Sequence, residues 1–357
     1  MSEPLATARA QLEAALERHY ARRWLMMLGG VAVLVAAAVV STGLGVDSMS
    51  PWRTARALAA PLLPAAWTAD LTSVQITVIR ELRLPRTLLA IIGGACMSLS
   101  GVALQGITRN PLVSPFTLGI SWAAAFGASV AILAGLASGW IVCAAFAAAL
   151  LCAGLVLGFS ALRGVNSIML ILGGVGLNFL FQALTNTTRF LANEQQLSAL
   201  IQWTFGSING ATWDEVWIVG GILLVLSPVL FAHRWALNAF AAGGDEVAAS
   251  LGFAVGRTRV VVTVVSVLLT AAIVAFAGEL GFVGLVAPHM ARLLVGGDHR
   301  ALLPFSAVVG ATLVLVADLI GRLAFAPLII PVGIVVAYLG VPLFLHLLLA
   351  RRREMLI

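Results

Sequence analysis

The sequence predicts an all-α polytopic membrane protein with about ten transmembrane helices. Two observations carry this prediction. Of the 357 residues, 61% are hydrophobic and only 10% are charged, whereas about a quarter of the residues of a soluble domain are charged. The apolar residues also gather into runs close to the roughly 20 residues that a helix needs to cross a bilayer. Such runs, joined by short connections, leave no room for a large soluble domain.

The predicted elements follow the chain in order. Residues 1–23 are expected to form a cytoplasmic amphipathic segment, because Glu3, Glu13 and Glu17 do not fit the charged start of a signal peptide. Residues 24–357 are assigned to a transmembrane domain, with spans expected at 24–42, 84–105, 113–135, 138–160, 166–191, 213–232, 260–278, 281–296, 302–324 and 331–350. An even number of spans puts both termini on one side. With the termini inside, most arginines face the cytoplasm, as the positive-inside rule requires.

The composition also excludes several classes of function. All 21 basic residues are arginine, and a P-loop needs a lysine to reach the phosphates of a nucleotide. The positive-inside bias explains the net charge of +6 without a nucleic acid partner. No cluster of histidine, cysteine and carboxylate has the spacing of a metal site, and Cys96, Cys143 and Cys152 lie in apolar runs. No nucleophile is paired with a base. We therefore expect no enzymatic activity, no metal and no cofactor in this chain.

The longest connection on the predicted cytoplasmic side is residues 233–259, which hold two acidic and several basic residues. Gly243-Gly244 breaks the chain, Asp245 is a residue type that caps helices, and Gly252 can end a helix after about two turns. A second short segment then ends in Arg257 and Arg259. A solvated loop would explain these charges. The glycine breaks and the capping residue favour a different interpretation, in which two short helices form a rigid docking surface on the cytoplasmic side.

Polar residues recur on one face of the span at 166–191. Asn178, Gln182, Thr185 and Arg189 are separated by four, three and four residues, which places them on the same side of a helix. Polar groups in hydrocarbon are costly unless they pair or face water. Two interpretations carry equal weight: hydrogen bonds between helices, and a wet translocation path with Arg189 near its outer mouth.

Two carboxylates are expected near the outer ends of spans. Asp318 and Arg322 are four residues apart, so an ion pair along the helix explains Asp318 without a functional role. Glu279 falls in the turn between the spans at 260–278 and 281–296. It is either an exposed loop carboxylate or a charge that faces an outer vestibule.

Several segments together resemble the FecCD-type ABC importer permeases, which move ferric siderophores, haem or cobalamin. The resemblance begins with RLPRTLLAIIGGACMSLSGVALQGITRNPLVSPFTLGIS at 83–121. It continues, in the order expected of the family, through WTFGSINGATW (203–213), GDEVAASLG (244–252), GFVGLVAPHMARLLVGGDHR (281–300), ADLIGRLAF (317–325) and PVGIVVAYLGVPLFLHLLL (331–349). The resemblance spans nearly the whole chain after the first span.

The resemblance implies the architecture and the partners of a type II ABC importer permease in the bacterial inner membrane. A second permease copy would complete a homodimer around a central path. Two separate ATPase subunits would use ATP and Mg below it, and a periplasmic substrate-binding protein would deliver the cargo. The lack of a P-loop lysine is consistent with this arrangement, because ATP hydrolysis belongs to another subunit.

The same resemblance assigns residues to roles. It assigns docking of the binding protein to Arg83, Arg86 and Arg322, whose guanidinium groups suit reversible pairing with carboxylates. A cytoplasmic gate falls on Val165, Asn166 and Ser167. Coupling to the ATPase falls on Gly244, Asp245, Glu246, Ser250, Leu251, Gly252 and Arg257. The chain departs from the family pattern at Glu279, at Ile329, where relatives often have Glu, and at Ala249, where they often have Arg.

The resemblance therefore predicts the transport of an iron chelate, a ferric siderophore or haem, into the cytoplasm by ATP-driven alternating access. Transport of cobalamin by a permease of the same family is the alternative. A secondary transporter would need carboxylates near the middle of the membrane, and Asp318 and Glu279 are expected toward the outer end. A receptor or scaffold without transport ranks below the importer as well.

Overall fold

The computed structural model describes residues 3–45, 49–64, 67, 69–162, 167–324 and 326–350, and every regular element in this part is helical. The α-helices are α1 Glu3–Gly43, α2 Pro51–Ala59, α3 Ser73–Thr77, α4 Leu84–Thr108, α5 Ile120–Leu133, α6 Ser138–Leu162, α7 Ser167–Leu191, α8 Glu194–Thr204, α9 Trp213–Ala232, α10 Arg234–Ser250, α11 Val255–Ala277, α12 Val283–Val295, α13 His299–Leu323 and α14 Val332–Ala350. A π-helical stretch, Val78–Arg83, joins α3 to α4.

The predicted spans are confirmed as helices. Within the described residues, seven helices are long and apolar enough to cross a membrane, and the shorter apolar helices Ile120–Leu133, Val283–Val295 and Val332–Pro342 match the other three spans. One boundary was wrong. Residues 113–119, predicted to begin a span, form turns ahead of α5, since Pro115 and the left-handed Gly119 (φ 79°) interrupt helical geometry there.

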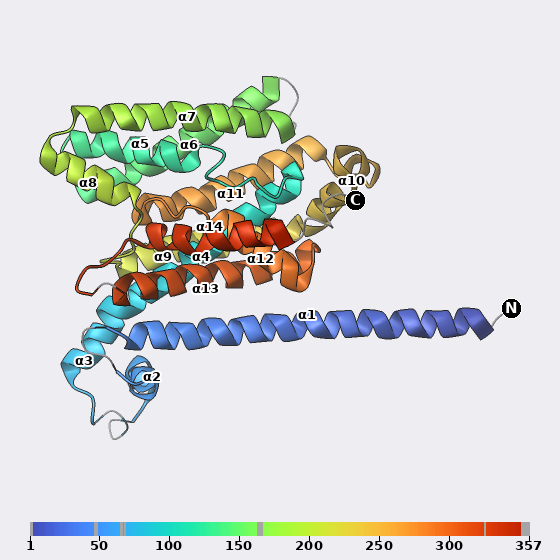
Figure 1. The fold of residues 1–357 in the computed structure, drawn as a ribbon, viewed down its shortest axis with the longest axis horizontal. Helices are drawn as coiled ribbons and strands as arrows, with labels where there is room; N and C mark the ends of the chain where they lie inside the picture. Colours follow the sequence, from blue (N-terminus) through green and yellow to red (C-terminus); the bar gives the residue numbers. More distant parts are fainter. Residues whose placement is uncertain are drawn as a thin grey trace.

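The long helices run side by side between two ends of the molecule (Figure 1). We call them the α2 end, where α2, α3 and α8 lie, and the α10 end, where α10 lies. Helix α1 runs without a break from Glu3 to Gly43, so its backbone does not mark the predicted boundary at residue 24. Its first turns extend past the other helices at the α10 end (Figure 1). Assignment of 1–23 to the cytoplasm stays a prediction.

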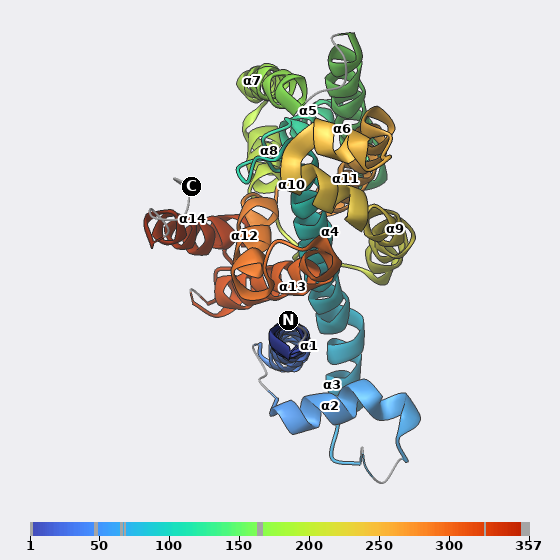
Figure 2. The same ribbon diagram turned by 90° about the vertical axis from the view of Figure 1, so that its right-hand side faces the viewer.

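Helix α4 is the centre of the bundle, and most of its side chains are buried. It packs against α9, α11, α12 and α13, and α1 lies outside α13 (Figure 2). At two crossings the backbones nearly touch. A Cβ on Gly94 would meet the carbonyl of Gly310 in α13, and a Cβ on Gly101 would meet that of Gly284 in α12. Glycine is needed at these crossings because small residues let membrane helices approach this closely.

A second group of helices, α5 to α8, lies beside the first. Helix α5 packs against α6, α7 and α8, and the group contacts the central one mainly where α11 meets α6 and α5. In the end-on view α7 and α14 lie toward the upper and left sides, whereas α9 lies on the right (Figure 2). Large apolar side chains such as Phe179, Trp217 and Tyr338 are mostly exposed on these outer helices. Such exposure fits contact with lipid or with other membrane helices.

Candidate functional site

A cluster of arginines around one buried carboxylate marks the α2 end. Asp318 is 2% exposed and accepts hydrogen bonds from Arg86 Nε (3.0 Å) and Nη2 (2.8 Å). Arg322 Nε lies 3.1 Å from the other oxygen of Asp318, which confirms the predicted ion pair along α13. The sequence alone did not reveal Arg86 as a partner, because 232 residues separate it from Asp318.

Arg83, Arg86 and Arg322 also donate to backbone, amide and hydroxyl groups. Arg83 Nη1 donates to the Gly43 carbonyl (3.0 Å), Arg322 Nη2 donates to the Ser41 carbonyl (2.9 Å), and Arg86 Nη1 donates to Asn209 Oδ1 (2.7 Å). All three arginines line one cavity of about 500 Å³ that is open at the α2 end. The structure thus brings the three predicted docking residues together at one cavity, with Arg86 and Arg322 paired to Asp318. Their docking role stays a prediction.

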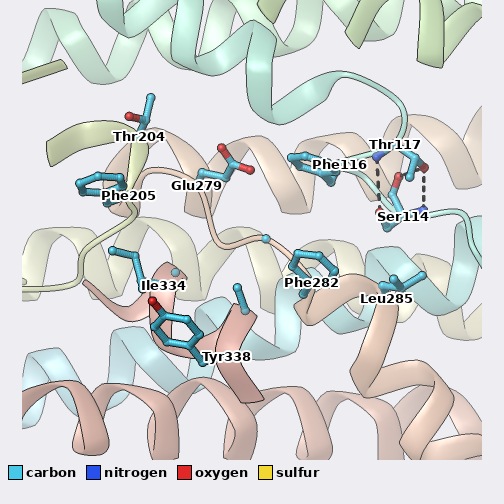
Figure 3. Close-up of a pocket in the computed structure, with 13 residues that line it drawn as sticks. Ser114, Phe116, Thr117, Thr204, Phe205, Glu279, Phe282, Leu285, Ile334 and Tyr338 are labelled. Atoms are coloured by element: carbon cyan, nitrogen blue, oxygen red, sulfur yellow. Dashed lines mark hydrogen bonds between the residues drawn. The ribbon is translucent and has the colours of Figure 1, made fainter. Parts of the chain in front are cut away.

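A second cavity, also about 500 Å³ in volume, lies between the end of α8, the loops before α5 and α12, and the start of α14. We call it the outer cavity. Phe116, Phe205 and Phe282 give it an apolar lining, and Ser114, Thr117 and Thr204 add hydroxyl groups (Figure 3). Ser114 and Thr117 bond to each other's backbone, since Thr117 Oγ1 donates to the Ser114 carbonyl at 2.8 Å. Tyr338, which is 72% exposed, closes one side.

Glu279 is the single acidic side chain among the described residues that line the outer cavity. It points into the space between Phe205 and Phe116 (Figure 3). Burial raises the pKa of Glu279 to about 7, and the positive charge of Arg189 opposes the rise. Of the two alternatives left by the sequence, the structure therefore favours the charge that faces a cavity. Ile329, the other departure at this end, is 44% exposed ahead of α14.

The α10 segment differs in part from the predicted pair of short helices. Gly244 (φ 78°, ψ −153°) divides α10 into two helical pieces, and the guanidinium group of Arg109 occupies the place a Cβ would take there. Gly252 (φ 85°) ends the second piece, as predicted. The other short helix, however, precedes Gly244 and does not follow Gly252. Residues Arg257 and Arg259 belong to the first turns of α11, which starts at Val255 and continues directly into the span.

Asp245 connects this segment to the interior of the bundle. It was predicted to cap a helix, but its carboxylate accepts a hydrogen bond from Arg259 Nη1 at 2.9 Å. Arg259 is 1% exposed and also donates through Nη2 to Ser167 Oγ (3.0 Å), at the first residue of α7. Glu246, Ala249, Ser250, Leu251 and Arg257 are exposed at the α10 end. One buried guanidinium thus joins the predicted coupling segment to a predicted gate residue; Val165 and Asn166 lie outside the described residues.

The polar stripe of α7 faces α5 and α8 within the subunit. Thr185 is fully buried and donates to the Phe181 carbonyl of its own helix (2.8 Å). Arg189 donates to Thr204 Oγ1 (2.9 Å) and lies over the ring of Trp122, 5.8 Å from its centroid. Asn178 packs against Gly119, and Gln182 is half-buried. None of these four residues lines the outer cavity, so packing accounts for the contacts seen and their place in a path stays a prediction.

Within the described residues, no three of His, Cys, Asp and Glu come together as a metal site. Cys96 and Cys152 are buried, Cys143 is exposed, and none of the three forms a disulfide. The arrangement offers cavities and charged surfaces for binding.

The FecCD transport family model matches residues 31–350. The chain belongs to the FecCD transport family. It is similar to the cobalamin import permease of Halobacterium salinarum, with 38% identity over 89% of this chain and 83% of the relative. It is also similar to the Fe(3+) dicitrate permease of Escherichia coli, with 37% identity over 82% of this chain and 92% of the relative. A solved ABC transporter of the metal-chelate type, in an inward-facing conformation, matches with a TM-score of 0.80, 34% identity and coverage of 91% of this chain and 98% of that one.

Membership of the FecCD family confirms the resemblance and the fold class predicted from the sequence. The contacts that the sequence missed connect residues far apart in the chain: Arg86 with Asp318, and Arg259 with both Asp245 and Ser167. The sequence contains one signal of these contacts, which is the presence of charged residues inside apolar segments. A carboxylate and an arginine inside apolar helices each need a partner, although their sequence positions do not identify it.

Proposed function

We propose that this chain is the transmembrane subunit of a binding-protein-dependent ABC importer and that it moves an iron chelate into the cytoplasm by ATP-driven alternating access. The contact that supports this best is the buried Arg259, which binds Asp245 of α10 and Ser167 of α7. A partner ATPase that moved the α10 segment would pull on the first turn of α7 through this guanidinium. In this proposal the α10 end lies on the cytoplasmic side of the inner membrane, and the α2 end lies on the periplasmic side.

The proposed cycle divides the work among the surfaces described. The arginine cluster at the α2 end receives the loaded binding protein through its carboxylates. A second permease copy faces the outer cavity and completes the path, and two ATPase subunits bind the α10 end. The apolar lining of the cavity supports weak contacts with a large cargo, which can then leave on the other side.

An iron chelate is favoured because several relatives, at 34 to 37% identity with the chain, are named for it: the Fe(3+) dicitrate, Fe(3+)-hydroxamate and Fe(3+)-citrate permeases. Cobalamin remains the second candidate, because a cobalamin permease shares 38%. A ligand screen on the binding protein that delivers cargo to this permease separates the two. Tight binding of cobalamin and none of ferric chelates would replace the first candidate by the second.

Reconstitution in proteoliposomes with the ATPase and the binding protein tests the transport cycle. We expect uptake to require ATP and both partners. The double substitution D245R/E246R should abolish uptake while the isolated ATPase still hydrolyses ATP, because a positive charge at position 245 is repelled by Arg259 and displaces the α10 segment. A charge reversal at Arg22, exposed at the same end but outside α10, serves as the control. Uptake that persists without the ATPase and collapses with an uncoupler would instead establish a secondary transporter.

The same assay tests the arginine cluster. R83Q/R86Q should weaken binding of the binding protein, because it removes two of the three guanidinium groups. D318N keeps all three arginines and loosens their internal pairing, so binding should be retained or strengthened. If both variants lose binding equally, the cluster is structural and the docking surface lies elsewhere.

A further inference from the structure

A separate cavity of about 450 Å³ opens between α1, α9 and α13 near the α10 end. Helices α1 and α13 both run from the α10 end into the bundle. Arg23 and Arg300 therefore lie one turn nearer that end than Met27 and Pro304, which line the same cavity on the same two helices. Phe231 at the end of α9 adds to the apolar part. The cavity thus has a cationic half toward the α10 end and an apolar half one turn deeper.

Positive charge exceeds negative charge around this cavity. Asp298 pairs with both Arg23 (3.0 Å) and Arg300 (2.7 Å), so one carboxylate serves two guanidinium groups. Burial alone would raise the pKa of Asp298, but hydrogen bonds from Arg300, Asn238 and Arg23 outweigh it and hold the pKa well below its usual range. Asp298 therefore stays ionised. Arg234 does not line the cavity itself but lies over the ring of Phe231, which does. With Arg234 included, the group carries three positive charges and one negative charge.

Aromatic rings hold these arginines at the surface. Arg300 lies over the ring of Trp235 at 4.8 Å, and Arg234 lies over that of Phe231 at 4.5 Å while it donates to the Phe231 carbonyl (2.9 Å). Trp24, which also lines the cavity, is 67% exposed. The apolar stretch of α13 begins at His299, and the first span is predicted to begin at residue 24, so the group lies at the edge of the hydrocarbon. Tryptophan and arginine are the residues that anchor helices at this level.

We propose that this cavity binds one anionic phospholipid from the leaflet at the α10 end. Its phosphate is held by Arg300, Arg23 and Arg234, and an acyl chain lies along Trp24, Met27 and Phe231. Guanidinium groups pair with phosphate oxygens in bidentate geometry, and basic pockets between transmembrane helices bind anionic headgroups. A zwitterionic headgroup would bring its own cation next to surplus positive charge. A free phosphate ion would leave the apolar half empty.

The lipid would join α1 to the rest of the bundle. Helix α1 packs mainly on α13, and this cavity is where α9 approaches the same pair of helices. A bound lipid fills the space between α9 and the packed pair of α1 and α13. Its removal should loosen α1 first. This site is independent of the cargo and of the proposed transport cycle.

Lipid binding can be measured on the purified full-length chain in detergent. We expect phosphatidylglycerol to raise the unfolding midpoint and to bind about 30-fold more tightly than phosphatidylcholine, the ratio that two surplus charges at a membrane surface provide. Inorganic phosphate should have no effect. R234Q/R300Q should lose the preference for phosphatidylglycerol. R56Q is the matched control, since Arg56 is likewise paired with an aspartate, Asp70, but at the α2 end.

Native mass spectrometry of the wild-type chain gives a second readout that does not depend on any variant. One phosphatidylglycerol should remain bound when detergent strips the other lipids. Equal stabilisation by both phospholipids, an undiminished preference in R234Q/R300Q, or stabilisation by phosphate alone would each overturn the proposal.

Discussion

Glu279 shows how one side chain can set the character of a cavity. The outer cavity is otherwise apolar or hydroxyl-lined, and the positive charge that acts on Glu279 is that of Arg189. A carboxyl group with a pKa raised to about 7 is mainly neutral below that pH and mainly charged above it. A charged form repels an anionic chelate, and a neutral form does not. The charge of the cavity therefore changes within the physiological pH range.

This gives a prediction for E279Q. If the cargo is an anionic chelate, wild-type uptake should fall as the external pH rises from about 6 to about 8, because Glu279 ionises across this range. Uptake by E279Q should be independent of external pH over this range and near the wild-type level at the acidic end. The measurement is uptake in proteoliposomes with the ATPase side held at constant pH, compared with R189Q to test the opposing charge. Identical pH profiles for wild type and E279Q would exclude this role.

Helix α4 and its neighbours show what glycine does at the scale of elements. Gly94 and Gly310 face each other across the crossing of α4 and α13, and a Cβ on either one would meet the carbonyl oxygen of the other. Backbone atoms cannot rotate away as a flexible side chain can. The position therefore tolerates no side chain, and the whole crossing depends on it.

We expect G94A to destabilise the chain by about 3 kcal/mol, at the upper end of the cost of overpacking a core. The measurement is the unfolding midpoint in detergent. G221A in α9 is the control: no atom lies within 4 Å of a Cβ there, and alanine is the better helix former. A midpoint for G94A equal to that of G221A would show that the two helices can separate without cost.

At the scale of the whole molecule, the outer cavity lies on a face that one chain does not close. Tyr338 lines this cavity and is 72% exposed, and large apolar side chains such as Phe179 and Phe190 are exposed on α7. Helix α9 lies on a different side of the molecule (Figure 2). A second copy that packs against α7 and α14 would complete the wall of the cavity.

Cysteine cross-linking in membranes tests this arrangement. In a background with Cys143→Ser, which removes the exposed native thiol, Y338C should form a covalent dimer with a short bifunctional thiol reagent. W217C, equally exposed on α9, should remain monomeric under the same treatment. Efficient cross-linking through W217C with none through Y338C would place the second copy on the opposite face.

Much of the fold could be predicted from the sequence, because hydropathy identifies spans and each predicted span coincides with a helix. The ion pair of Asp318 with Arg322 followed from their spacing, whereas Arg86 reaches Asp318 only through the packing of α4 on α13. The second short helix was misplaced because Gly252 marks a helix end but gives no sign that α11 begins three residues later. Local patterns identify elements, and contacts between distant elements require the structure.

The near contact of the main chains of α4, α12 and α13 also limits how the subunit can change shape. Sliding between helices normally takes place in the layer of side chains that separates them, and at Gly94, Gly101, Gly284 and Gly310 that layer is missing. These three helices must therefore travel as a single rigid block. Within one subunit, relative movement is therefore expected where α5 to α8 meet the central helices, at the contacts of α11 with α5 and α6.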